Sequence, residues 1–165
     1  MLALQYCKIA LVFFIGVFAC LVGWNNIADY GSNWMFVQHV MSMDTTFEGN
    51  ALMGRAITNP TIQQLGYWGI IVAELATGVL CLIGSVLMLR SVRDLAALFN
   101  RSKAMAFYGL TLGFILWFFG FMTVGAEWFL MWQSQTWNGQ DAAFRFIVCI
   151  GLVLLLVAMD DREAA

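Results

Sequence analysis

Charged residues are scarce in this chain of 165 residues. Asp, Glu, Lys and Arg together make up 11%, whereas a soluble domain carries about 25%. Apolar residues make up 62%, and the mean hydropathy is +0.81. These values exclude a soluble globular domain, and the small net charge of -2 gives no basis for binding nucleic acid. The composition therefore predicts a single integral membrane domain.

Residues that commonly carry catalysis or hold cofactors are also few. His39 is the only histidine, which excludes two-histidine haem ligation and leaves Asp44 or Glu48 as the nearest further ligands for a metal. We favour a water-facing histidine there. The chain has no CxxC pair, glycine-rich phosphate loop or nucleophile elbow. We therefore expect no enzyme activity, no metal and no cofactor.

Cysteine is limited to four residues, all in or beside apolar segments. Disulfides form in oxidising compartments, and none of the four lies in a loop that would face one. We expect small buried hydrophobic side chains at Cys7, Cys20, Cys81 and Cys149.

Four apolar segments are each long enough to cross a bilayer, since a spanning helix needs about 20 residues. They cover residues 9–24, 67–89, 104–127 and 142–159. The link 90–103 holds Arg90, Arg93, Arg101 and Lys103 against Asp94 alone. By the positive-inside rule this link is cytoplasmic, and so are both termini. We expect an all-α, four-transmembrane-helix bundle in one domain, with outer loops at 25–66 and 128–141. The charged residues 160–163 that follow the fourth segment should form a solvated tail.

Both outer loops combine tryptophan with polar side chains, which is typical of the interface between membrane and water. We expect them to form an ordered cap with short interfacial helices, one of them capped by Ser32 or Asn33. The amides that alternate with tryptophans could bind a headgroup, or dock the two loops onto each other and onto a partner. The candidate cap residues are Trp24, Asn25, Asn26, Asp29, His39, Asp44, Trp128, Trp132, Gln133, Gln135, Trp137 and Asn138.

Three ionisable residues fall in the outer halves of the spanning segments. Glu74, Glu127 and Arg145 converge on the outer leaflet when positions are counted at about 1.5 Å per helical residue. Charges inside a bilayer normally face a bundle interior or a cavity, because exposing them to lipid is costly. We therefore treat these three residues as one candidate cluster beneath the cap.

Helical periodicity supports this placement of the two acids. Residues three or four apart share a helix face, and small residues let helices approach closely in a membrane. One stripe of the second segment comprises Glu74, Thr77, Gly78, Cys81, Gly84 and Ser85, and one stripe of the third comprises Gly109, Gly113, Gly120, Thr123 and Glu127. We expect both acids on packed faces, with Gly109 and Gly113 providing a GxxxG contact.

Two interpretations of the cluster stay open. Arg145 paired with Glu74 or Glu127 would be a structural ion pair that fixes the fourth helix against the others. One base cannot neutralise two acids, however. The second carboxylate could then hold a cation, bind a lipid or substrate headgroup, or exchange a proton.

Several stretches are shared with a known family. They are MDTTF at 43–47, WNN and FVQHV in the first loop, and GAEWFLMWQSQTWNGQDAAFRF at 125–146. Through them nearly the whole chain resembles a family of predicted small integral membrane proteins of bacteria, grouped under a domain of unknown function. That family usually has a second glycine where this chain has Ala126. The resemblance implies a four-helix protein of the bacterial inner (plasma) membrane, and it supplies no activity, substrate or catalytic residue.

Two functional hypotheses follow from the sequence. The first is a non-enzymatic accessory or self-associating subunit whose cap makes contacts, as a homo-oligomer or in a larger membrane complex. The alternative is a binder or carrier of a lipid headgroup, small polar ligand or proton at the Glu74, Glu127 and Arg145 cluster. In both hypotheses membrane lipids surround the protein.

Overall fold

The protein is all-helical in a computed structural model that describes residues 2–161. The chain runs through α1 (Leu2–Ala28), α2 (Tyr30–Ser42), the 3-10 turn η1 (Met53–Arg55), α3 (Pro60–Arg90), α4 (Ala96–Ser102), α5 (Ala104–Ile115), the π-helix η2 (Leu116–Trp128), the 3-10 turn η3 (Met131–Gln133) and α6 (Gln140–Ala158). Four helical segments are long and apolar enough to cross a membrane: Leu2–Ala28, Pro60–Arg90, Ala96–Trp128 and Gln140–Ala158. The structure therefore has four candidate membrane-spanning helices, the number predicted from the sequence.

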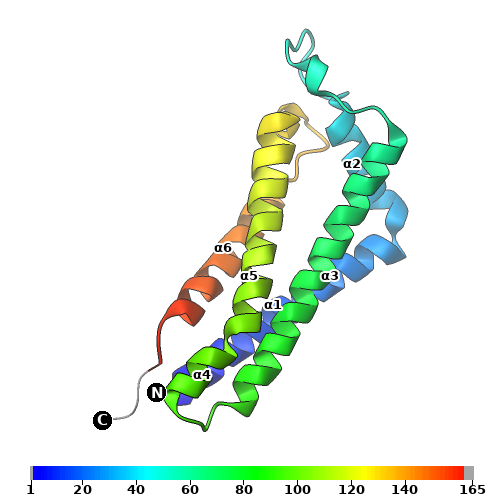
Figure 1. Ribbon diagram of the computed structural model, residues 1–165. Coiled ribbons are helices and arrows are strands. Elements are labelled where there is room, and N and C mark those ends of the chain that lie inside the picture. The colour runs from blue at the N-terminus through cyan, green and yellow to red at the C-terminus, as the bar shows by residue number, and fades with distance from the viewer. Residues whose placement is uncertain (1, 162–165) are drawn as a thin grey trace.

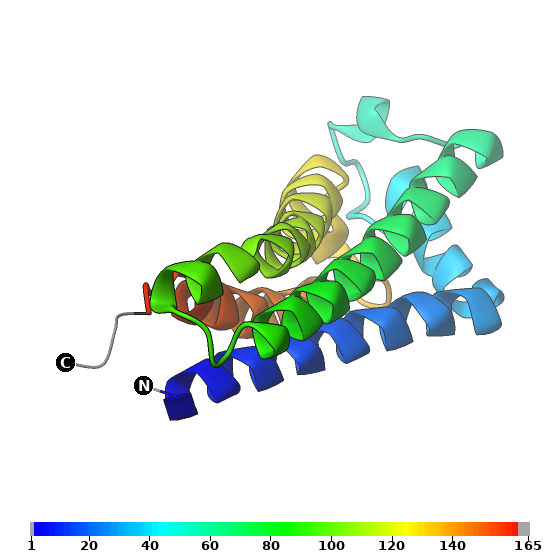
Figure 2. The same cartoon turned by 60° about the horizontal axis from the view of Figure 1, so that its bottom comes forward.

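The long helices pack in a simple order. Helix α1 lies along α3, α3 lies along α5, and α6 covers α5 and η2 (Figure 1). Both ends of the described chain lie at the end of the bundle where α4 links α3 to α5 (Figure 2). Helix α2 and the loop that carries η1 lie at the opposite end, which is the cap (Figure 1). This arrangement agrees with the predicted placement of both termini on the side opposite the cap.

Glycines bring α3 close to both of its neighbours. A Cβ atom added at Gly78 would lie 2.8 Å from the backbone nitrogen of Cys20 on α1. Three residues further along the same stripe, a Cβ atom at Gly109 of α5 would lie 2.8 Å from the backbone nitrogen of Cys81. The predicted close approach through small residues is confirmed. The whole stripe predicted on this helix is buried: Glu74, Thr77, Gly78, Cys81, Gly84 and Ser85.

The stripe predicted on the third span holds for only half its length. Gly109 and Gly113 are buried, but Thr123 and Glu127 are exposed. The backbone changes to π-helical hydrogen bonding in η2, where Phe129 N donates to Val124 O at 3.0 Å across five residues. A wider turn breaks the 3.6-residue period from which the stripe was extrapolated. The expected burial of Glu127 is therefore wrong.

Helices α3 and α2 begin earlier in the sequence than the elements predicted for these regions. Helix α3 begins at Pro60, seven residues before the apolar segment, and the side chain of Asn59 caps it by accepting from Thr61 N at 2.9 Å. Helix α2 begins earlier than expected, at Tyr30. Asp29 occupies its cap position without a capping bond, so Ser32 is not a cap; its hydroxyl donates to the Asp29 carboxylate at 2.8 Å.

The cysteines divide between the two kinds of surface. Cys81 is buried and Cys20 half-buried, whereas Cys7 and Cys149 are exposed, and all four are free thiols. The expectation of burial is wrong for the last two. Both lie on faces of α1 and α6 that no neighbouring helix covers.

Replacing Gly78 by alanine tests the glycine contact. We expect Gly78→Ala to lower the free energy of unfolding by about 1–3 kcal/mol, because the added methyl group forces α1 and α3 apart. Gly69→Ala is the matched control on the same helix, since nothing lies within 4 Å of its added Cβ; it should leave stability unchanged or raise it slightly. Unfolding midpoints in detergent measure both, and equal losses would contradict the assignment.

Candidate functional site

Glu74 is a buried carboxylate tied to two other helices through amides. Its residue is 2% exposed. Asn26 Nδ2 of α1 donates to Glu74 Oε2 at 2.6 Å, and Asn33 Nδ2 of α2 donates to Asn26 Oδ1 at 2.6 Å. The hydroxyl of Tyr67 donates to the backbone oxygen of Asn26 at 3.0 Å. This chain of hydrogen bonds leads from the bundle interior to Asn33, which is exposed.

The Glu74 side chain borders a cavity of about 220 Å³, called here the Glu74 cavity. Asn26 and Asn33 give it a polar side, while Trp117 and Phe146 belong to its aromatic lining. Among residues 2–161, no Lys, Arg or His forms an ion pair with Glu74. An uncompensated charge in such a place costs several kcal/mol. The site therefore favours a state in which a proton or a cationic group compensates the carboxylate.

The expected cluster of Glu74, Glu127 and Arg145 does not form. Arg145 is exposed, and its Nε donates to the backbone oxygen of Asp141 at 3.2 Å. Glu127 is exposed as well. The buried face of α6 runs through Ala143, Ile150, Val153 and Val157, and Arg145 points away from that face. The predicted ion pair of Arg145 with either acid is absent from the described part of the chain.

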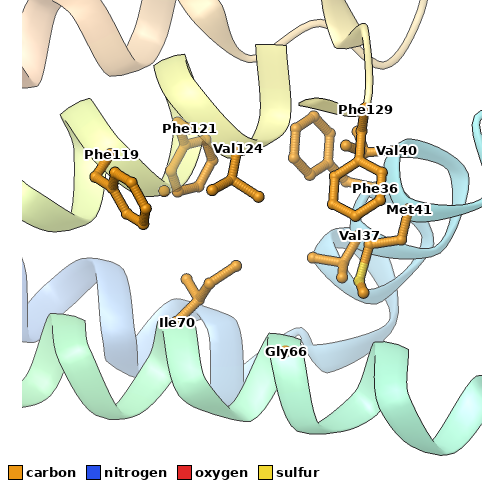
Figure 3. A pocket seen from close by; sticks show the side chains of 11 residues that line it. Phe36, Val37, Val40, Met41, Gly66, Ile70, Phe119, Phe121, Val124 and Phe129 are labelled. Carbon is orange, nitrogen blue, oxygen red and sulfur yellow. The ribbon is translucent and has the colours of Figure 1, made fainter. Parts of the chain in front are cut away.

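A second cavity of about 250 Å³ adjoins the first and is apolar. Carbon and sulfur side chains of α2, α3 and η2 line it (Figure 3). Phe36, Ile70 and Phe121 line both cavities, and the rings of Phe36 and Phe121 stack with centroids 6.3 Å apart. The apolar cavity therefore continues the Glu74 cavity toward the space between α3 and η2.

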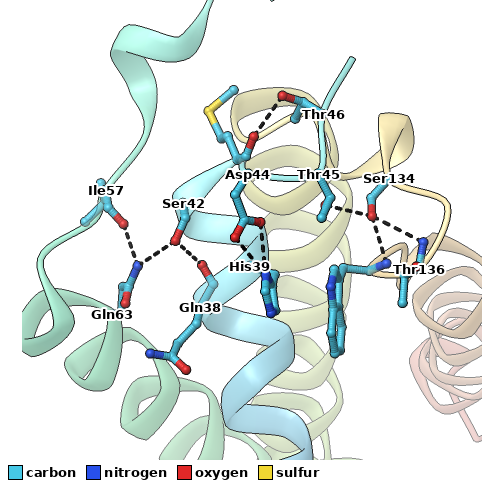
Figure 4. Close-up of polar contacts among 12 residues, drawn as sticks. Gln38, His39, Ser42, Asp44, Thr45, Thr46, Ile57, Gln63, Ser134 and Thr136 are labelled. Atoms are coloured by element: carbon cyan, nitrogen blue, oxygen red, sulfur yellow. Dashed lines mark hydrogen bonds and ion pairs between the residues drawn. The ribbon is translucent and has the colours of Figure 1, made fainter. Parts of the chain in front are cut away.

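The cap is ordered because its two loops hydrogen-bond to each other. Thr45 Oγ1 donates to Ser134 Oγ at 2.8 Å, and Phe47 N donates to Gln133 Oε1 at 3.0 Å. Gln63 Nε2 ties the first loop to α3 by donating to Ile57 O at 2.7 Å (Figure 4). Of the amides expected to dock the two loops onto each other, Gln133 makes such a contact, whereas Asn138 bonds locally at the start of α6.

His39 has a local role within the cap. Its Nδ1 lies 2.8 Å from Asp44 Oδ2 (Figure 4), and its ring stacks on Trp137 with centroids 4.7 Å apart. The stacking on Trp137 holds α2 against the second loop, and the bond to Asp44 joins α2 to the turn that follows it. Within the described residues no three His, Cys, Asp or Glu side chains group in a way that could hold a metal.

The other cap residues lie around this docked core. Arg55 lies over the Trp128 ring at 4.9 Å, and Trp132 meets Phe47 edge to face at 5.7 Å. Asn138 Oδ1 accepts from Gln140 N at 3.1 Å near the start of α6. Of the predicted cap residues, the exposed ones are Trp24, Asn25, Asp29, Asp44, Trp128, Trp132, Gln135 and Asn138.

A charged cluster at the opposite end of the bundle escaped sequence reasoning. Lys8 and Lys103 are 0% and 2% exposed, and both bind Asp161 Oδ2, at 2.7 and 2.6 Å. Both also donate to Met159 O, and Asn100 Nδ2 donates to Asp161 O at 2.9 Å. The expectation of a solvated tail at residues 160–163 is therefore wrong for Asp161. Residues 162 and 163 lie outside the described residues.

A signal for both missed groups was present in the first segment. The buried face of α1 includes Lys8, Val12, Gly16, Ala19, Gly23 and Asn26, at spacings of three and four residues. Extending the Gly16–Gly23 spacing beyond the apolar boundary would have placed Lys8 and Asn26 on the packed face. The bond from Asn26 to Glu74 does not follow from the predicted segments, because the first segment ends at residue 24 and α1 extends to Ala28.

Together these features define a class: a small multi-pass integral membrane protein with four candidate spanning helices, a cap of two docked loops and a buried carboxylate beside a cavity. Within that class, the chain belongs to the family described as predicted small integral membrane protein (DUF2165), whose model matches residues 4–160. The family has no assigned function. No curated protein and no solved structure matches the chain significantly.

Replacing Asp161 by asparagine tests the cluster at the chain end. We expect Asp161→Asn to cost about 3–5 kcal/mol of stability, because it leaves two buried lysines without their carboxylate. Asp160→Asn is the matched control, since the neighbouring Asp160 is exposed and surface changes are usually within about 0.5 kcal/mol. Thermal unfolding in detergent measures both variants. A similar loss in each would contradict the buried pairing.

The same cluster has a defined pH dependence. Burial raises the pKa of Asp161, but hydrogen bonds from Lys103 and Lys8 outweigh that effect and leave the pKa below its ordinary value. A carboxyl group with a lowered native pKa stabilises the fold fully above its unfolded value, about 4, and loses this contribution as the pH falls through the native value. The stability difference between wild type and Asp161→Asn should therefore shrink below about pH 4.

Proposed function

We propose that this protein is a non-enzymatic membrane protein that binds a small cationic group, a protonated amine, at Glu74. The observation that carries the proposal is a carboxylate that is 2% exposed, borders a cavity and has no cation among the described residues. Opposite charge beside such a carboxylate is strongly favourable where water is scarce. Arg145 cannot supply this positive charge, because it is exposed on the face of α6 opposite the buried one. A ligand would therefore supply it.

The lining of the Glu74 cavity favours an amine over a metal ion. Calcium takes six to eight oxygen ligands and magnesium six, whereas Glu74 is the one carboxylate in this lining. Trp117, Phe121 and Phe146 supply aromatic surface instead. Aromatic faces attract organic cations, and an ammonium group donates hydrogen bonds that a carboxylate accepts. A protonated amine with a short apolar substituent matches both sides of the cavity.

Butylamine is a suitable probe of amine binding at Glu74. At ten times its dissociation constant, a ligand stabilises the native state by about 1.4 kcal/mol, which shifts a melt by a few degrees. We expect this shift for wild type and not for Glu74→Gln, which keeps an oxygen to accept from Asn26 but carries no charge. Glu127→Gln removes an exposed carboxylate and should respond as wild type does. The neutral analogue 1-butanol should shift none of the three.

Equal shifts for wild type and Glu74→Gln, or no shift for wild type, would refute amine binding at Glu74. The hypothesis of an accessory or self-associating subunit would then be favoured. The exposed pair of Phe47 and Trp132 in the cap offers that hypothesis a contact surface, since the two residues are 55% and 44% exposed. Cooperative melting of Glu74→Gln without amine serves as the folding control.

We further propose that the cap faces outward from a bacterial inner membrane, with both termini in the cytoplasm. Arg90, Arg93 and Arg101 lie at the end opposite the cap, which the positive-inside rule assigns to the cytoplasm. The Glu74 cavity would then receive ligands from the outer leaflet or the space beyond it.

Cysteine labelling tests this orientation. In a variant whose four native cysteines are replaced by alanine, Glu48→Cys in the cap and Asp94→Cys in the α3–α4 link introduce single thiols at exposed positions. We expect a membrane-impermeant maleimide to label Glu48→Cys in intact spheroplasts and to label Asp94→Cys only after permeabilisation. The reverse pattern would place the cap inside.

A further inference from the structure

We infer that the amine bound at Glu74 is the head of a single-chain amphiphile whose hydrocarbon chain occupies the adjoining apolar cavity. This inference rests on the proposed function and adds the chemical class of the ligand. Two cavities of about 250 and 220 Å³ share part of their walls, and one is apolar while the other carries the carboxylate. A ligand that fits both is polar at one end and hydrocarbon at the other.

The junction of the two cavities is aromatic. Phe36 of α2 and Phe121 of η2 line both spaces, with their rings stacked at an interplanar angle of 21°. A flexible methylene chain passes beside stacked rings more easily than a branched or second chain does. A single flexible chain attached to a small head therefore fits this junction.

The apolar cavity reaches the lipid between α3 and η2. Gly66 and Phe119 belong to its lining, and both are exposed although they lie on membrane-spanning segments. Gly66 contributes no side chain to close this side (Figure 3). Lipid tails are as apolar as the cavity, so moving the chain from the bilayer contributes little to affinity. Recognition then depends on the head at Glu74, and the cavity limits the shape of the chain.

A different arrangement of the same kind of ligand has to be distinguished. A shallow surface groove with Arg55 and Glu127 in its lining shares Phe119 and Val124 with the apolar cavity. An amphiphile could place its head there, at the membrane surface, and still insert its chain between α3 and η2. The position of the head therefore has to be measured together with that of the chain.

Photolabelling of the full-length protein in nanodiscs measures both. The probe is octylamine with a diazirine at the end of its chain, and labelled peptides are identified by mass spectrometry. We expect labels on η2 near Phe119 and Val124, lost in Glu74→Gln and retained in Glu127→Gln and Arg55→Ala. Excess octylamine should compete with the probe, whereas 1-octanol should not.

Two glycines of α3 provide a matched pair of variants for the chain. A side chain at Gly66 extends into the apolar cavity, where the nearest atom to its Cβ would be Met41 Sδ at 3.4 Å, whereas Gly69 lines neither cavity and faces open space. We expect Gly66→Leu to lower the yield of labels near Phe119 and Val124, because the leucine side chain occupies space that the hydrocarbon chain would fill. Gly69→Leu should leave it unchanged. Both variants should keep the thermal shift caused by butylamine.

The outcomes separate this inference from the proposed function. A wild-type protein that butylamine does not stabilise would refute binding at Glu74 itself. Stabilisation by butylamine with equal labelling in Gly66→Leu and Gly69→Leu would refute only the chain position. Labelling that disappears in Glu127→Gln but persists in Glu74→Gln would place the head in the surface groove and overturn the inference.

Discussion

Close contact of α3 with α1 and α5 is the constraint on which the rest of the structure depends. Gly78 and Gly109 leave no room for side chains where the backbones meet, so this part of the bundle is held tightly. Toward the cap, α3 and the π-helix that continues α5 diverge (Figure 1), and α2 packs against α3. Packing in a membrane relies on such contacts because lipid provides no hydrophobic drive between helices. The two cavities lie in this part of the bundle, where α2, α3 and η2 are less closely packed.

Buried carboxylates at the two ends of the bundle differ in whether a cation compensates their charge. At the terminal end, Lys8 and Lys103 share the carboxylate of Asp161, which fastens the last described residue to α1 and α5. In the half toward the cap, Glu74 has an amide partner and, among residues 2–161, no cation. Buried charges are tolerated when they are paired. The terminal cluster is therefore neutralised within the described chain, whereas Glu74 is not, and the proposed ligand site rests on this contrast.

Sequence reasoning failed where it assumed a regular helix or a sharp membrane boundary. The period of 3.6 residues placed Glu127 on a packed face, but the π-helical backbone turns it outward. Asn26 and Asp161 were assigned to a loop and a tail because they are polar and flank apolar segments. In the structure both are buried and bonded, at 6% and 7% exposure. Hydrogen bonds to partners distant in the sequence offset the loss of hydration on burial: Asn26 bonds to Glu74, 48 residues away, and Asp161 bonds to Lys8, 153 residues away.

The amino-acid sequence by itself determined the membrane class, the four spanning helices, the buried stripe of α3 and the presence of a cap, because hydropathy and periodicity are local properties of the chain. Only the tertiary structure decided which charges meet. Whether Glu74 faces Arg145 or Asn26 depends on the rotation of α6 about its axis and on how far α1 extends. The residues near Glu74 in the sequence indicate neither of these. Partner choice across a bundle is set by the packing of all its helices together.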